Sequence, residues 1–173
     1  MKLIYITSLI LLTSISSQVY AQKCPIQKDK HLINTDEKGQ NIAMEGYDIV
    51  EYFNTKQEKG SPKLIAVYQG INYLFISENN KNSFEAKPEK YLPQYGGFCA
   101  VAASFGKAEE LQTYDLYEVK DGKLYFSKNS KAHKLWTKNP DKVIGKANEK
   151  WPCIVKDLGL KIEDPYKEPT SIK

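Results

Sequence analysis

Cys99 is the residue of this sequence whose side chain is best suited to metal binding or catalysis. It follows Tyr95-Gly96-Gly97-Phe98 and begins a run of small residues. A cysteine thiolate is a good ligand for Cu(I) or Zn(II), and a histidine or a carboxylate can complete such a site. Copper or zinc held by Cys99, Asp48 and His133, with Glu51 as a further carboxylate, is therefore the first hypothesis. The supply of ligands is small, because two His and three Cys occur without a CxxC or HxxxH pair.

Cys99 has two other interpretations. A thiol near a helix N-terminus can act as a nucleophile or a redox group, but no His lies near Cys99 in the sequence. Cysteine is also a small apolar residue that packs well in a core. His133 lies within Lys131-Ala132-His133-Lys134, a pattern that predicts a solvated side chain on the polar face of a helix. Serine-hydrolase chemistry is disfavoured, because the chain has no GxSxG motif.

A small-ligand site is the second hypothesis. Its candidate residues combine aromatic rings, a carboxylate and a glycine pair, namely Tyr47, Asp48, Tyr95, Gly96 and Gly97. Each also has a structural interpretation: the glycines permit a positive φ, the tyrosines fill a core, and Asp48 caps a short helix.

Length and charge limit the possible functions. The chain has 173 residues, which is enough for one domain with flanking segments. All 25 basic residues are lysine, so the arginine fork that best recognises guanine is absent from the sequence. The net charge of +4 is spread among alternating signs, and no basic stripe forms. Nucleic-acid binding is therefore not expected.

The N-terminus has the pattern of an export signal. Met1-Lys2 is followed by the apolar stretch from Leu3 to Ile15, and Val19-Tyr20-Ala21 offers small residues to a signal peptidase. We expect cleavage after Ala21 and a periplasmic or extracellular mature chain that is not inserted in a membrane. The alternative is an uncleaved N-terminal anchor.

Export makes disulfide formation possible. Cys24 and Cys153 lie in Pro-flanked segments at the two ends of the mature chain, whereas Cys99 lies within its aromatic body. We therefore expect a Cys24–Cys153 disulfide and a free Cys99. Three free thiols are the alternative, if the two ends lie too far apart.

Short helices and hairpins are expected to position these residues. Turn residues, capping residues and the alternation of apolar side chains define the boundaries. The first half is predicted to contain a lead-in over 22–43, a short helix capped by Asp48 with Val50, Tyr52 and Phe53 inward, a hairpin of 64–68 and 73–76, and a helix capped by Ser77 with Phe84 and Ala86 toward the hairpin. A loop over 91–97, a helical turn over 98–103 and a hairpin of 115–119 and 124–126 that turns at Asp121-Gly122 are predicted next. The rest is predicted to contain a helix capped by Asn129 with Ala132, Leu135 and Trp136 at helical spacing, a last helix over 140–150 ending at Trp151-Pro152, and a poorly ordered tail over 161–173.

The ordered motifs resemble the YHS-domain family. The matching segments are Gly46 to Phe53, Gly70 to Phe75, Phe84, Pro88 to Tyr91 and Tyr95 to Ala100, while Asp121 to Tyr125 and Trp151-Pro152 resemble its exported, stand-alone branch. The resemblance implies a small single α+β domain of hairpins and short helices, of YHS (TRASH-like) type, over 44–152. The signal peptide (1–21) and the lead-in (22–43) would precede it, and a C-terminal tail (153–173) would follow.

The chain departs from the family at its thiol positions. Members attached to copper-transporting ATPases carry cysteines where this chain has Glu51, Ile76 and Asn80. The resemblance thus implies a small binding module more than an enzyme, for a small ligand or a soft metal ion such as copper. A thiol-dependent enzyme or redox protein using Cys99 is one alternative, and a purely structural or interaction domain is the other.

Overall fold

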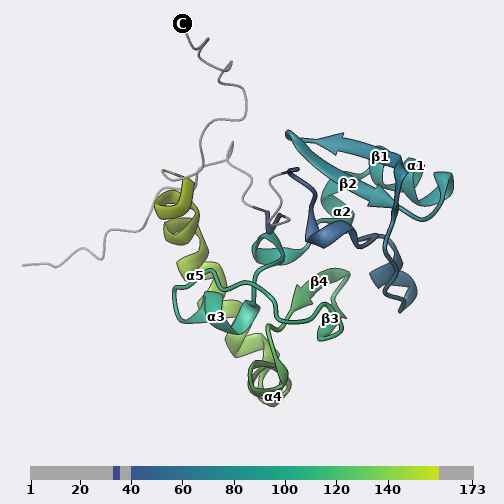
Figure 1. Ribbon diagram of the computed structural model, residues 1–173. Helices are drawn as coiled ribbons and strands as arrows, with labels where there is room; N and C mark the ends of the chain where they lie inside the picture. The colour runs from purple at the N-terminus through teal and green to yellow at the C-terminus, as the bar shows by residue number, and fades with distance from the viewer. Residues whose placement is uncertain (1–32, 36–39, 160–173) are drawn as a thin grey trace, which may run out of the picture.

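The computed structural model describes residues 33–35 and 40–159. The predicted signal peptide, most of the predicted lead-in and the predicted tail beyond residue 159 lie outside this range. The described chain is a small α+β structure with two antiparallel hairpins and several helices, which confirms the coarse fold class (Figure 1).

The first hairpin and the helix that covers it form as their local sequence predicts. Strands β1 (Ser61–Tyr68) and β2 (Ile71–Phe75) are joined at Gln69-Gly70, where both residues have positive φ as a tight two-residue turn requires. Helix α1 (Glu78–Ala86) begins where the Ser77 hydroxyl accepts the Asn80 N–H, and Pro88 opens the short α2 (Pro88–Tyr91). Phe84 is buried against the hairpin, but Ala86 is exposed, so its predicted inward position is wrong.

The second hairpin lies between two groups of helices. Strands β3 (Tyr117–Lys120) and β4 (Lys123–Phe126) are joined at Asp121-Gly122, as predicted. Leu124, Tyr125 and Phe126 are all buried, since β4 is covered on both faces. Leu124 and Phe126 pack into one apolar cluster and Tyr125 into the other, so β4 joins the two parts of the core.

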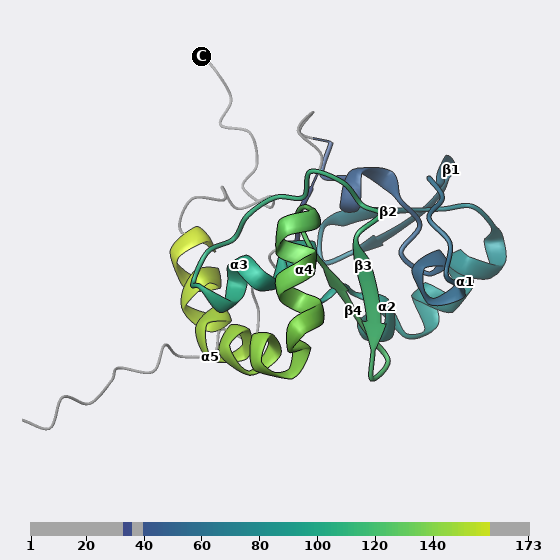
Figure 2. The same cartoon turned by 90° about the horizontal axis from the view of Figure 1, so that it is seen from below.

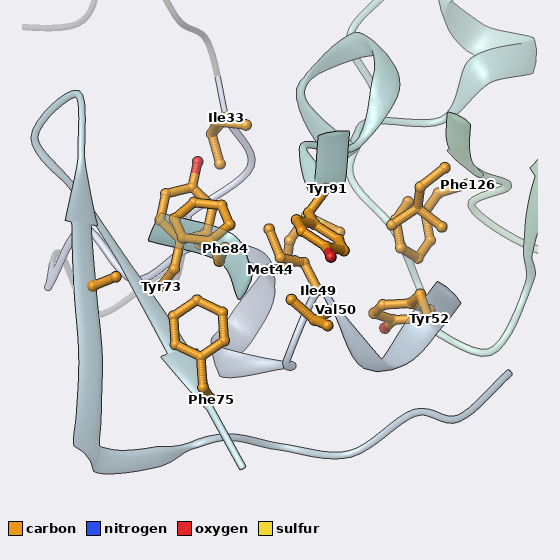
Figure 3. Close-up of a cluster of buried hydrophobic side chains, with 13 residues drawn as sticks. Ile33, Met44, Ile49, Val50, Tyr52, Tyr73, Phe75, Phe84, Tyr91 and Phe126 are labelled. Carbon is orange, nitrogen blue, oxygen red and sulfur yellow. The ribbon is translucent and has the colours of Figure 1, made fainter. Parts of the chain in front are cut away.

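The first apolar cluster lies around the β1–β2 hairpin (Figure 3). Phe84 packs against the rings of Tyr73 and Phe75 with centroid distances of 4.7 and 5.3 Å. Tyr52 meets Phe126 edge to face at 5.1 Å, which is a favoured geometry for aromatic pairs. The aromatic richness of the sequence is thus used mainly to fill this core.

The second apolar cluster is helical. Helix α3 (Ala100–Ser104) packs against α4 (Ser130–Lys138) and α5 (Pro140–Gly159), on the side of the molecule away from β1 and β2 (Figures 1 and 2). The small side chains of α3 are buried and allow this close approach. Asn129 caps α4 by accepting the Ala132 N–H, as predicted.

Three short 3-10 helices complete the fold. They span Met44–Gly46, Glu51–Asn54 and Gln94–Gly97. The second is the helix predicted after Asp48, but its cap position is Val50 and not the predicted Asp48, whose carboxylate accepts the Val50 N–H at 2.9 Å. The third contains Tyr95, Gly96 and Gly97, all with positive φ. A side chain at Gly97 would place Cβ 2.2 Å from the Met44 sulfur, so this approach requires glycine.

The last helix is longer than predicted. Helix α5 continues through Pro152 to Gly159, so the helix end predicted at Trp151-Pro152 is wrong and the predicted domain boundary at 152 falls inside the helix. An interior proline costs a helix about 3 kcal/mol. Ile154 and Val155 are buried beyond it, and each burial contributes roughly 1.5–3 kcal/mol, which offsets that cost.

None of the helices within residues 40–159 combines the length and the apolar character that crossing a membrane demands.

Candidate functional site

Cys99 lies at a pocket between α3 and α4. Its N–H donates to the Glu109 carbonyl at 3.0 Å, and its carbonyl accepts the Ala103 N–H at 2.9 Å, which fixes it at the start of α3. The pocket has a volume of about 620 Å³, within the range of small-molecule sites. We refer to it as the Cys99 pocket.

Apolar and charged side chains share the lining of the Cys99 pocket. The apolar part is formed by Cys99, Val101, Ala102, Phe105, Ala132 and Leu135. The polar part is formed by Lys107, Glu109, Lys128, Asn129 and Lys131. Three lysines thus face one glutamate, so the lining is positively charged at neutral pH.

Lys128 and Glu109 form an ion pair at the pocket. The Lys128 Nζ lies 2.5 Å from the Glu109 Oε2. This hydrogen bond lowers the pKa of Glu109 and raises the pKa of Lys128. Both groups therefore stay ionised around neutral pH, and the glutamate cancels only one of the three lysine charges.

The structure does not bring the three predicted metal ligands together. Cys99 lines the pocket, Asp48 is buried in a separate cluster of polar residues, and His133 is not part of the pocket lining. Among the described residues, no group of three or more His, Cys, Asp or Glu side chains could hold a metal ion.

His133 differs from its predicted environment. It is half-buried, and its Nδ1 is enclosed without a hydrogen-bond partner in the described part of the chain. The expectation of a solvated side chain is therefore wrong. His133 lies three residues before the buried Trp136 on α4 and so shares the edge of that helix's inward face.

Asp48 and Glu51 belong to a buried polar network. The Asp48 carboxylate accepts hydrogen bonds from the Val50 N–H at 2.9 Å, the Ile76 N–H at 2.9 Å and the Asn80 amide at 2.8 Å. The same Asn80 amide nitrogen donates to Glu51 at 2.7 Å. Because every carboxylate contact here is a hydrogen bond that supports the fold, the network has a structural role.

The residues predicted as a ligand site make contacts that support the fold. Tyr47 stacks on Tyr114 at 4.9 Å, and the Tyr95 hydroxyl donates to the Asn148 side chain at 2.9 Å. Burial raises the pKa of Tyr95. The Gly96 carbonyl accepts the Asn34 N–H at 2.7 Å, and Gly97 packs on Met44. None of Tyr47, Asp48, Tyr95, Gly96 and Gly97 lines the Cys99 pocket.

The cysteines differ in redox state. Cys99 is a free, buried thiol, and Cys153 is disulfide-bonded. Cys24 lies outside the described residues, so its pairing with Cys153 stays a prediction.

Mass mapping of the mature chain can test this pairing. After alkylation without reduction, we expect label on Cys99 only once the protein is unfolded, and one peptide pair that joins Cys24 to Cys153. The closed loop would stabilise the fold by roughly 4–5 kcal/mol in the chain-entropy model. A peptide that links Cys99 to either of the other cysteines would refute the assignment.

The sequence indicates Cys99 but not most of the residues that surround it in the pocket. Phe105 and Lys107 follow α3, Lys128 follows β4, and Leu135 lies on α4. Leu135, predicted at helical spacing with Ala132 and Trp136, is 42% exposed and lines the pocket. The spacing of Lys131 and Leu135, four residues apart, was the available signal for a lining helix face.

No protein-family model matches the chain, and no curated protein or solved structure is significantly similar to it.

Proposed function

We propose that this chain is an exported, non-enzymatic binding module of the YHS type, and that the Cys99 pocket is its ligand site. One observation carries the proposal: a cavity of about 620 Å³ with a mixed apolar and cationic lining lies between α3 and α4. Pockets of this size with a few convergent polar groups are the usual form of a small-molecule site.

The buried network supports the YHS resemblance. The resemblance places Glu51, Ile76 and Asn80 at the positions where the family carries its thiols. In this structure they lie together, because the Ile76 N–H and the Asn80 amide both contact Asp48 and Asn80 also contacts Glu51. Two of these positions are thus in side-chain contact here, with the Glu51 carboxylate and the Asn80 amide in place of thiols, while Ile76 joins the network only through its backbone N–H.

A soft-metal site at Cys99 is the second candidate. The free thiol at the pocket favours it. The thiol has no exposed surface, and Lys107, Lys128 and Lys131 repel a cation. A thiol enzyme is less well supported, because no histidine lines the pocket to serve as a base.

A fragment titration followed by NMR tests the proposal. The amide chemical shifts of the mature chain are recorded while small neutral, cationic and anionic fragments from a library are added. We expect the largest shifts at Ala102, Ala132 and Leu135, with the β1–β2 hairpin as an internal reference. The ligand site is refuted if no fragment shifts these residues, or if the shifts gather elsewhere.

A Cu(I) titration decides between the two candidates. Wild type and Cys99→Ser compete with a chelator for the metal under reducing conditions. We expect equal and weak Cu(I) affinity in both proteins, because the thiol is enclosed and its neighbours are cationic. A large loss of affinity in Cys99→Ser, with the fold intact by circular dichroism, would make the metal site the correct function.

A further inference from the structure

The charge of the Cys99 pocket selects for an anion. Lys107, Lys128 and Lys131 contribute three positive charges against the one negative charge of Glu109. Lys128 is already paired with Glu109, while Lys107 and Lys131 are exposed at the same pocket. An acidic group placed here would meet two ammonium groups that are accessible from solvent, so attraction favours it over a neutral or cationic group.

The apolar side chains at the pocket select for a hydrophobic body. Phe105 is 66% exposed and Leu135 is 42% exposed. Among the described residues, five large hydrophobic side chains are exposed, and these two both line the Cys99 pocket beside Val101. A single exposed apolar residue needs no explanation, but a group of them around one cavity is typical of a binding site.

We propose that the Cys99 pocket binds a small amphipathic anion, with its acidic head at Lys107 and Lys131 and its apolar tail against Val101, Phe105 and Leu135. The inference rests on the proposed function and names the ligand class of that site. The acidic head alone does not suffice for binding, because exposed lysines hold a small anion weakly in water. The acidic head can be a carboxylate or a phosphate, since lysine acts on both as a point charge.

A chain-length series tests the tail. Calorimetric titrations of the mature chain use hexanoate, octanoate and decanoate below their micelle concentrations, with decyl phosphate as the second head group. We expect the Kd to fall roughly two- to fourfold per added methylene until the pocket is filled. Acetate should show no measurable binding. Decanol, which has the tail without the charge, should bind at least fivefold more weakly than decanoate.

Matched variants locate the binding. Phe105→Ala and Leu135→Ala should each raise the Kd for decanoate at least fivefold, because they remove apolar lining. Val67→Ala and Ile65→Ala are the controls, since these β1 residues are 68% and 39% exposed and lie outside the pocket. Lys131→Met keeps an apolar stem and removes the charge. It should therefore raise the Kd for decanoate and leave the Kd for decanol unchanged.

The inference is overturned by a Kd that is independent of chain length, by equal effects of Phe105→Ala and Val67→Ala, or by decanol binding as tightly as decanoate. If fragments bind at Ala102 and Ala132 but amphipathic acids have no advantage, the ligand class is wrong and the site stands. If no fragment shifts these residues, the proposed function fails as well. If the protein sediments with phosphatidylglycerol vesicles and Leu135→Ala still does so, the lysines would be assigned to a membrane surface. That result would refute the pocket ligand.

Discussion

Gly60→Ala is expected to lower the free energy of unfolding by about 3–5 kcal/mol. A Cβ at Gly60 would lie 2.3 Å from the Leu74 carbonyl carbon and 2.4 Å from the Phe75 nitrogen. Both atoms are backbone of β2, so no side chain can rotate away, and the strand itself would have to move. The Gly60 N–H also donates to the Gly46 carbonyl at 2.8 Å, which holds the chain in place at this approach.

Urea denaturation of the mature chain measures this effect, and Gly145→Ala is the matched control. Gly145 lies in α5, where an added Cβ would meet nothing within 4 Å beyond its two chain neighbours and the nearby backbone of its own helix. Alanine is a better helix former than glycine, so this variant should gain about 0.5–1 kcal/mol. The interpretation of Gly60 is wrong if the free energies of unfolding of Gly60→Ala and wild type differ by less than about 0.5 kcal/mol, a range typical of ordinary surface substitutions.

Local chemistry made most of the elements predictable. The turn at Asp121-Gly122 and the caps at Ser77 and Asn129 each depend on a few neighbouring residues, and each forms as expected. The continuation of α5 through Pro152 was not predictable, because the proline rule is local. The burial of Ile154 and Val155 that outweighs it depends on the folded structure.

The site was less predictable than the fold. The sequence indicated Cys99, but its neighbours at the pocket come from segments after α3, after β4 and on α4. Which lysines converge depends on how α3 packs on α4, and a solvated lysine has no periodic signal of its own. The lining residues therefore follow from the tertiary structure alone.

The buried polar network could not be predicted from the sequence either. Asp48 was predicted as a helix cap, but the cap position of the helix Glu51–Asn54 is Val50, and Asp48 lies before it and accepts the Val50 N–H. Its contacts with Ile76 and Asn80 join residues about 30 positions apart, and no local pattern shows that they meet. The network therefore has a larger role in stability than a single cap.

Asp48→Ala is expected to cost about 3–5 kcal/mol of unfolding free energy. The substitution leaves the Val50 N–H, the Ile76 N–H and the Asn80 amide without their acceptor. An unsatisfied buried polar group costs roughly 1–3 kcal/mol, and Asp48 itself has no exposed surface. Urea denaturation should show a lower midpoint with an unchanged m-value, because the same surface is exposed on unfolding.

Two further variants separate the Asp48 network from a general effect of charge. Asp48→Asn keeps one oxygen that can accept the Ile76 and Asn80 donors but turns an amide nitrogen toward the Val50 N–H, so it should lose less stability than Asp48→Ala. Asp141→Ala removes an exposed carboxylate 3.2 Å from the Lys120 Nζ, and a surface ion pair is worth about 0–1 kcal/mol. Equal losses in Asp48→Ala and Asp141→Ala would mean that the buried hydrogen bonds contribute nothing beyond the charge, which would refute the structural role of the network.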